Sequence, residues 1–368
     1  MQHATAFFEL DADALKAWVT DRGMPAFVSK QLLDWVYRRG VIDPAQMTDL
    51  SKANRDLLSH EMRFEQSLVR RHLQASDGTQ KLLMAWPRDA AARAAGDVSL
   101  PLADATPGAG ERETECVMIP ADGRKTACVS SQIGCPVGCR FCASGIGGLE
   151  GNLTRGRIVE QVWKLGRLPD VERISHVVFM GMGEPLSNFE AVTGAIRTLN
   201  ADWGLGISAR RITVSTVGLP SAIEKLMGFD IPVTLALSLH APTDELRRQI
   251  IPWAEYSTIP QLLEACHEWF RATGREITLE YILLGGFNDA IEHAEELARL
   301  ARSIRANVNL IRWNEVEGLP YTRPATEHVH AFQETLRTRG VNAHIRASRG
   351  RDIAAACGQL RHEARAAR

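Results

Sequence analysis

Three cysteines stand close together at a spacing suited to an iron–sulfur cluster. In the segment CPVGCRFC, Cys135, Cys139 and Cys142 follow a C-x3-C-x2-C pattern. A 4Fe–4S cluster takes four ligands, so three thiolates would hold it and leave one iron open to a small molecule. A three-ligand catalytic zinc with a bound water is the alternative. A structural zinc site is less favoured, because the sequence offers no second C-x2-C or H-x3-H pair.

The chain has seven cysteines, and the other four are Cys116, Cys128, Cys266 and Cys357. An odd number argues against a framework of structural disulfides. Clustered thiols in a reducing compartment indicate metal binding or thiol chemistry instead. Taken singly, each of these four cysteines is most simply a small buried residue.

Polar residues at several other points have the types that would bind a cofactor. In the segment Gly181-Met182-Gly183-Glu184, glycines would let backbone carbonyls approach a ligand closely, and an amino-acid ammonium would suit those carbonyls and the carboxylate. Glycine after a strand is more commonly only a turn. The further candidates are Ser215, Ser238, Leu239, His240 and Asn314. Each polar one, taken alone, is more often a residue that caps a loop.

These residues need elements that bring them to one place, and the chain from Lys125 alternates strand and helix patterns. The expected strands cover residues 125–131, 175–180, 211–215, 233–239, 277–283, 307–312 and 342–346. Such alternation predicts a parallel sheet with right-handed crossovers, and six or seven units fit a full or partial β/α barrel. Catalytic groups of such barrels lie at the carboxyl ends of the strands, where the cysteines and polar residues above would meet.

The domain organisation follows from changes in pattern along the chain. We expect a helical accessory domain at 1–62 and a β-extension at 63–124 with a surface loop at 87–113. The barrel would occupy 125–350, and 351–368 would form a C-terminal segment. The fold class is therefore α/β, a partial (β/α)6-type barrel with a small helical N-terminal domain and a short β-extension.

The amino-acid composition excludes some classes of protein but does not identify a function. The chain has 45% hydrophobic and 24% charged residues, which are globular values. It has no apolar run long enough to span a membrane and no signal-peptide pattern, so we expect a cytoplasmic protein without membrane contact. A net charge of -1 does not favour nucleic acid, whose binding domains are usually basic.

Taken together, the motifs resemble those of a known family. The cysteine loop, with an aromatic residue before its third cysteine, is similar to that of radical S-adenosylmethionine enzymes. The segments TACVSSQIGCPVGCRFC, VVFMGMGEPL, RRITVSTVG, LALSLHAPTDELR, NLIRWN and RGRDIAAACGQL resemble the RlmN/Cfr family of RNA adenosine methyltransferases. The resemblance covers residues 10–85 and 113–362 and is closer to the RlmN branch. After Cys142 the chain reads ASGIGGLEGNL and departs from the family pattern.

This resemblance implies a mechanism and roles for particular residues. It implies a 4Fe–4S cluster held by three cysteines, with its open iron for S-adenosylmethionine, and two molecules of that cofactor in each turnover. Cys357 matches the cysteine that carries the methyl group, and Cys128 matches the one that releases it through a transient disulfide. Glu115 aligns with a residue proposed as the base. The cofactor contacts would come from Gly183, Glu184, Ser215, Ser238, Leu239, His240 and Asn314.

The implied substrate is carbon 2 of an adenosine in 23S ribosomal RNA and transfer RNA. That carbon lies on the pairing edge, so the base must be unpaired or splayed out. Arg346, Arg349 and Arg351 flank Cys357 and could hold phosphates. By the same resemblance, the helical domain at 1–62 could add contacts to the RNA. We expect a monomer that takes electrons from a donor such as flavodoxin or ferredoxin. The alternatives are carbon-8 methylation within the same family, or a non-catalytic iron–sulfur or zinc protein that binds RNA or senses redox state.

Overall fold

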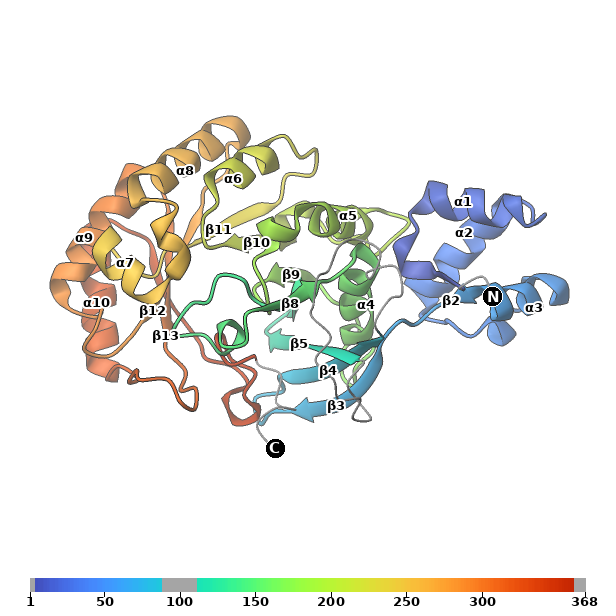
Figure 1. Ribbon diagram of the computed structural model, residues 1–368, viewed down its shortest axis with the longest axis horizontal. Coiled ribbons are helices and arrows are strands. Elements are labelled where there is room, and N and C mark those ends of the chain that lie inside the picture. Colours follow the sequence, from blue (N-terminus) through green and yellow to red (C-terminus); the bar gives the residue numbers. More distant parts are fainter. Residues whose placement is uncertain (1–3, 88–110, 361–368) are drawn as a thin grey trace, which may run out of the picture.

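Among the described residues, a curved sheet of ten strands forms the centre of the molecule (Figure 1). The computed structural model describes residues 4–87 and 111–360. Along the sheet the strand order is β14-β13-β12-β11-β10-β9-β6-β5-β4-β3, and neighbours from β6 to β14 are parallel. The parallel strands are β6 (Arg124–Cys128), β9 (His176–Phe179), β10 (Ile212–Thr216), β11 (Thr234–Ser238), β12 (Thr278–Leu283), β13 (Asn307–Arg312) and β14 (Ala343–Arg346). Because β14 and β3 are its two edges, the sheet is a partial barrel.

Helices connect successive parallel strands and cover the outer face of the sheet (Figure 1). They are α4 (Arg155–Leu165), α5 (Phe189–Asn200), α6 (Pro220–Met227), α7 (Asp244–Ile250), α8 (Ile259–Thr273), α9 (Ile291–Ser303) and α10 (Thr326–Thr338). Side-chain caps fix several starts: Thr154 accepts from the Arg157 amide, and Thr243 from the Leu246 amide. The alternation expected from the sequence is present, with the first strand ending at Cys128, earlier than expected.

Three antiparallel strands extend the sheet beyond β6. They are β3 (Leu68–Gln74), β4 (Gln80–Pro87) and β5 (Glu111–Ala121). The turn between β3 and β4 is an Asp-Gly turn, in which Asp77 accepts from the Thr79 amide and Gly78 has a φ of 80°. The loop expected at 87–113 falls, between residues 88 and 110, outside the described residues, as do residues 361–368.

A helical unit at the N-terminus packs against α4 (Figure 1). It contains α1 (Ala12–Asp21), α2 (Phe27–Leu33), which continues as a π-helix over Asp34–Arg39, and α3 (Lys52–Glu61). Trp163 of α4 contacts this unit: its indole nitrogen donates to the Val36 carbonyl at 2.8 Å, and its ring centre lies 5.7 Å from that of Phe8. In the part of the chain that the structure describes, no helix is long and apolar enough to cross a membrane.

Candidate active site

The three cysteines of the C-x3-C-x2-C loop line a cavity of about 150 Å3 at the carboxyl ends of the barrel strands. Gly134, with a φ of 72°, allows the loop to start, because a Cβ there would lie 2.0 Å from the Gly148 carbonyl oxygen. Trp313 donates to the Phe141 carbonyl at 3.0 Å, and the Ala143 amide donates to the Gly358 carbonyl at 2.8 Å. The barrel and the C-terminal segment therefore both hold this loop in place.

The donor set of this cavity suits a cluster better than a single ion. Burial raises the pKa of Cys135 to about 12 and raises the pKa values of Cys139 and Cys142, so these thiols become thiolates only beside a strong positive charge. Among the described residues, no three His, Cys, Asp or Glu side chains converge as ligands of one metal ion. Zinc ligands must meet at one point, whereas the cysteines of an iron–sulfur cluster bind separate iron atoms.

Glu184 lies beside the cysteines, after β9, and is 3% exposed. Its two carboxylate oxygens accept from the backbone amides of Leu186 at 3.0 Å and Val217 at 2.8 Å. Burial nevertheless raises the pKa of Glu184 to about 7. Gly183 has a φ of 104°, and a Cβ there would lie 2.6 Å from that of Gln132. This pair is placed as the sequence predicted, on the rim with the cysteines.

The next two strands contribute polar groups to the same cavity. The hydroxyls of Ser215 and Ser238 are 3.2 Å apart. His240 has a φ of 62°, a strained conformation that is concentrated at functional sites. Its Nδ1 accepts from the Ile282 amide at 3.1 Å, and burial lowers its pKa to about 3, so the ring is neutral. Leu239 is fully buried and does not line this cavity.

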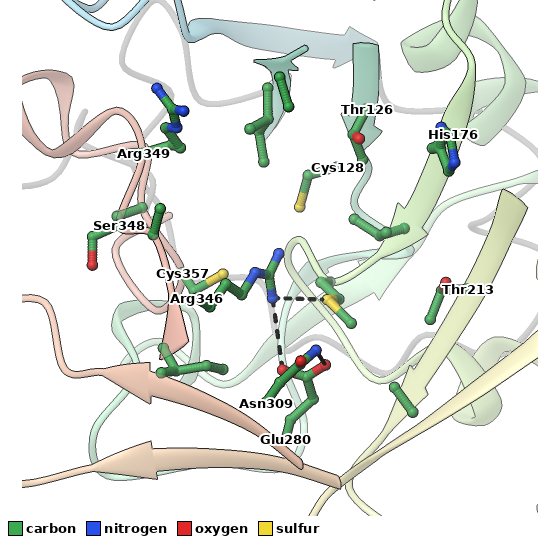
Figure 2. A pocket seen from close by; sticks show the side chains of 18 of the residues that line it. Thr126, Cys128, His176, Thr213, Glu280, Asn309, Arg346, Ser348, Arg349 and Cys357 are labelled. Carbon is green, nitrogen blue, oxygen red and sulfur yellow. Dashed lines mark hydrogen bonds and ion pairs between the residues drawn. The ribbon is translucent and has the colours of Figure 1, made fainter. Parts of the chain in front are cut away.

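Cys357 and Cys128 line a second, larger cavity of about 610 Å3 in the barrel interior (Figure 2). Cys128 ends β6, whereas Cys357 follows a short 3-10 turn at Arg351–Ile353. Cys357 also lines the smaller cavity, so this thiol faces both the cluster loop and the barrel interior. Asn314, two residues after β13, donates to the Cys357 carbonyl at 3.2 Å. Burial, with the charge of Cys357, raises the pKa of Cys128 to about 12.

Glu115 is placed differently from the other predicted residues. It lies on β5, is 2% exposed, and lines neither of these two cavities. Its carboxylate pairs with the Lys81 ammonium at 2.7 Å, and Lys81 also donates to the Ala354 carbonyl at 3.1 Å. In this conformation the pair holds the segment that carries Cys357, and the role of Glu115 as a base stays a prediction.

Some residues of the barrel interior were not predicted from the sequence, and one was expected to have another role. Arg346, expected at phosphates, instead points into the barrel, where its Nη1 lies 3.3 Å from the Met180 sulfur and 3.7 Å from Glu280 (Figure 2). Asn309 donates to Glu280 at 3.0 Å. The sequence could have indicated a polar site here, because Glu280 is a charged residue in the middle of the mainly apolar strand segment ITLEYILL.

Comparisons with known proteins agree with this architecture. A model of the radical SAM superfamily matches residues 129–301, and one of the ribosomal RNA large subunit methyltransferase N-terminal domain matches residues 5–63. The probable dual-specificity RNA methyltransferase RlmN of Gloeobacter violaceus is 44% identical over 354 residues, which cover 95% of this chain and 93% of that protein. The protein of the same name from Rhodopirellula baltica is 42% identical over 350 residues, covering 95% and 88%.

A solved structure gives the same result for the fold. A radical SAM methyltransferase from Sphaerobacter thermophilus matches with a TM-score of 0.88 and 39% identity, covering 97% of this chain and 99% of that one. The expected fold class is therefore confirmed. The superfamily implies a 4Fe–4S cluster and S-adenosylmethionine, which the cysteine cavity suits. Because the identity extends over nearly the whole length of both proteins, the chain belongs to the RlmN family of the radical SAM superfamily.

Proposed function

We propose that this protein methylates carbon 2 of an adenosine in 23S ribosomal RNA and transfer RNA. The observation that carries the proposal is the position of Cys357, which faces the cysteine cavity on one side and shares the barrel interior with Cys128 on the other. A cysteine that served only to fill the core would not be expected to line both cavities. The names of the relatives, dual-specificity RNA methyltransferases, support RNA as the substrate.

The cluster would be held by Cys135, Cys139 and Cys142, and the cofactor by Gly183, Glu184, Ser215, Ser238, His240 and Asn314. When bound, the cluster and S-adenosylmethionine supply a methyl group and a carbon-centred radical, and two molecules of S-adenosylmethionine would be consumed in each turnover. Electrons would come from a donor such as flavodoxin or ferredoxin. The protein's own residues then carry, position and release the methyl carbon.

The thiols have complementary roles in this scheme. Cys357 loses its proton and takes the methyl group as a thioether. The bound cofactor and cluster would supply the chemistry that removes one hydrogen atom from this methyl group and one electron from the adduct, so that the carbon becomes bonded to carbon 2 of the RNA base. Glu115 would remove the proton from carbon 2. Cys128, as the thiolate, then attacks the Cys357 sulfur, so that an S–S bond forms as the bond from sulfur to the transferred carbon breaks. The carbon leaves with the electron pair of that bond and takes up a proton, which makes it the methyl group of the product. A thiol reductant must reduce this disulfide before the next turnover.

Replacement of Cys128 tests this scheme directly. Cys128→Ala should leave the RNA covalently bound to Cys357, because no thiol remains to release it, whereas Cys357→Ala should give neither adduct nor methylated RNA. The adduct is detected by denaturing electrophoresis of labelled RNA and by peptide mass spectrometry. Cys266→Ala, at a fully buried thiol in α8, is the matched control and should form no adduct.

The position of methylation requires a separate measurement. RNA carrying deuterium at carbon 2 of adenosine should lose that deuterium when it is methylated, and RNA labelled at carbon 8 should keep its label. Loss from carbon 8 would instead establish the other activity of the family. A Cys128→Ala protein that cleaves the cofactor but never forms an adduct would contradict the thiol scheme.

A further inference from the structure

The two cavities of the barrel meet at a layer of residues that line both. This layer contains Met180, Glu280, Ile311, Arg346 and Cys357. Two of them are charged, and they come from strands far apart in the chain, β12 and β14. Charged side chains are costly to bury unless they are paired or bind something. The proposed roles of the cysteines and of the rim residues make no use of this charged pair.

Glu280 is only partly satisfied by its neighbours. It is 3% exposed, and one carboxylate oxygen accepts from Asn309 at 3.0 Å. Its other oxygen, Oε2, is buried without a hydrogen-bond donor among the described residues, and it lies 3.7 Å from the nearest nitrogen of Arg346. A buried acceptor without a donor destabilises the protein, because no hydrogen bond offsets the cost of removing it from water.

The guanidinium of Arg346 also has few hydrogen-bond partners. Its only hydrogen-bond acceptor among the described residues is the Met180 sulfur, 3.3 Å away, and a thioether is a weak acceptor. The charges of Cys357 and Glu280 raise the pKa of Arg346, so the guanidinium remains a cation with free N–H donors. The layer therefore offers one buried acceptor without a donor beside the N–H donors of Arg346, a side chain that is 26% exposed.

We propose that Glu280 and Arg346 read the pairing edge of the target adenine, an assignment that rests on the function proposed above. Glu280 accepts a hydrogen bond from the exocyclic amine, and Arg346 donates one to ring nitrogen N1. In adenine the order along this edge is amine, N1 and carbon 2. In the barrel Arg346 extends between Glu280 on one side and Cys357 on the other (Figure 2). The same order therefore turns carbon 2 toward the thiol of Cys357.

This arrangement separates adenine from the other bases by its chemistry. Guanine and hypoxanthine, the base of inosine, present a carbonyl oxygen and an N1–H, so they would place an acceptor against Glu280 and a donor against the Arg346 cation. Cytosine presents an amine and a ring acceptor in the adenine order, but its next position is a carbonyl without a hydrogen to replace. A site that pairs buried polar groups with its substrate rejects analogues that leave them unpaired.

Base substitution in the RNA tests the proposal without altering the protein. The holoenzyme with its cluster is titrated, without reductant, with a stem–loop RNA whose one unpaired adenosine is retained or replaced by purine riboside, which lacks the amine, or by inosine. Affinity is read by fluorescence anisotropy at one salt concentration. We expect adenosine to bind about tenfold more tightly than either analogue, the size of discrimination typical of one paired base edge.

Variants then assign the discrimination to a residue. Glu280→Gln can turn a donor toward the carbonyl of inosine, so its preference for adenosine over inosine should fall about tenfold or reverse. Thr213→Val, at another residue lining the larger cavity, should keep the wild-type preference. Affinity for S-adenosylmethionine should be unchanged in both variants, which separates recognition of the RNA base from recognition of the cofactor's own adenine.

The outcomes also separate this proposal from the function on which it rests. If the holoenzyme cleaves the cofactor but methylates no adenosine, the proposed function fails, whereas the preference in binding is measured without turnover. Equal affinity of the wild-type protein for adenosine, purine riboside and inosine would overturn the base-reading role. So would a wild-type preference in Glu280→Gln, or a loss of cofactor binding in that variant.

Discussion

At the scale of single residues, the buried carboxyl group of Glu184 has a raised pKa that should affect cofactor binding. Burial raises its pKa to about 7, although two backbone amides donate to its oxygens. In the protein without cofactor this carboxyl group therefore takes up a proton as the pH falls below about 7. If Glu184 holds the ammonium of S-adenosylmethionine, as proposed above, only its ionised form attracts that group, so a proton and the cofactor would compete for the same site.

We predict that the affinity for S-adenosylmethionine falls as the pH is lowered from about 8 to about 6, by up to about tenfold for each unit below the pKa. Isothermal titration calorimetry of the protein over this range measures the effect. Glu184→Gln should bind the cofactor more weakly, with an affinity that varies less with pH. A wild-type affinity that is constant across the range would show that Glu184 does not hold the ammonium.

At the scale of elements, glycines allow the turn after β9 to come close to the start of the cluster loop. A Cβ at Gly181 would lie 2.6 Å from the Val129 carbonyl oxygen, and one at Gly183 would lie 2.6 Å from the Gln132 Cβ. The second position also has a positive φ, which side chains with a Cβ rarely adopt. The sequence showed these glycines, but their ordinary interpretation was a simple turn.

We predict that Gly183→Ala lowers the free energy of unfolding by about 2–3 kcal/mol, because the new methyl group adds backbone strain to an overlap with Gln132. Cofactor affinity should fall as well, because Glu184 is the next residue. Thermal unfolding and calorimetry measure the two effects. The control is Gly147→Ala, where a Cβ meets nothing within 4 Å. Equal melting temperatures for the two variants would contradict the close approach.

At the scale of the whole molecule, the helical unit is joined to the barrel through α4. Trp163 is 5% exposed and donates to the Val36 carbonyl at 2.8 Å, while the Arg167 guanidinium lies 3.9 Å above its ring. Glu160, one turn earlier, accepts from the backbone amides of Gln66 and Ser67, each at 3.0 Å. The helix that follows the cluster loop therefore also anchors the N-terminal unit and the start of the β-extension.

We predict that Trp163→Ala lowers the free energy of unfolding by about 3–5 kcal/mol, the cost of a large buried cavity. The helical unit should be released first, so limited proteolysis should cut near residues 63–67 while the barrel stays intact. Phe27→Ala is the control, because this side chain is 60% exposed and its loss should change stability little. Simultaneous digestion of both parts would contradict the role given to this contact.

The sequence by itself determined the features that depend on neighbouring residues. Three cysteines within one short loop must face a common space, so their spacing predicted a cluster site. The alternation of strand and helix patterns predicted the barrel, and the carboxyl ends of parallel strands necessarily share a rim. Resemblance to a family added Cys128 and Cys357, which no local pattern connects.

Only the tertiary structure decided which residues face the barrel interior. Parallel strands are buried on both faces, so their sequences are nearly continuous apolar runs that do not show which side chains point inward. The position of the Arg346 side chain beside Glu280 and Cys357, where 26% of it is exposed, depends on how far the sheet curves. Sheet curvature is set by the packing of all the strands and helices together, and the pattern of any one segment does not contain it.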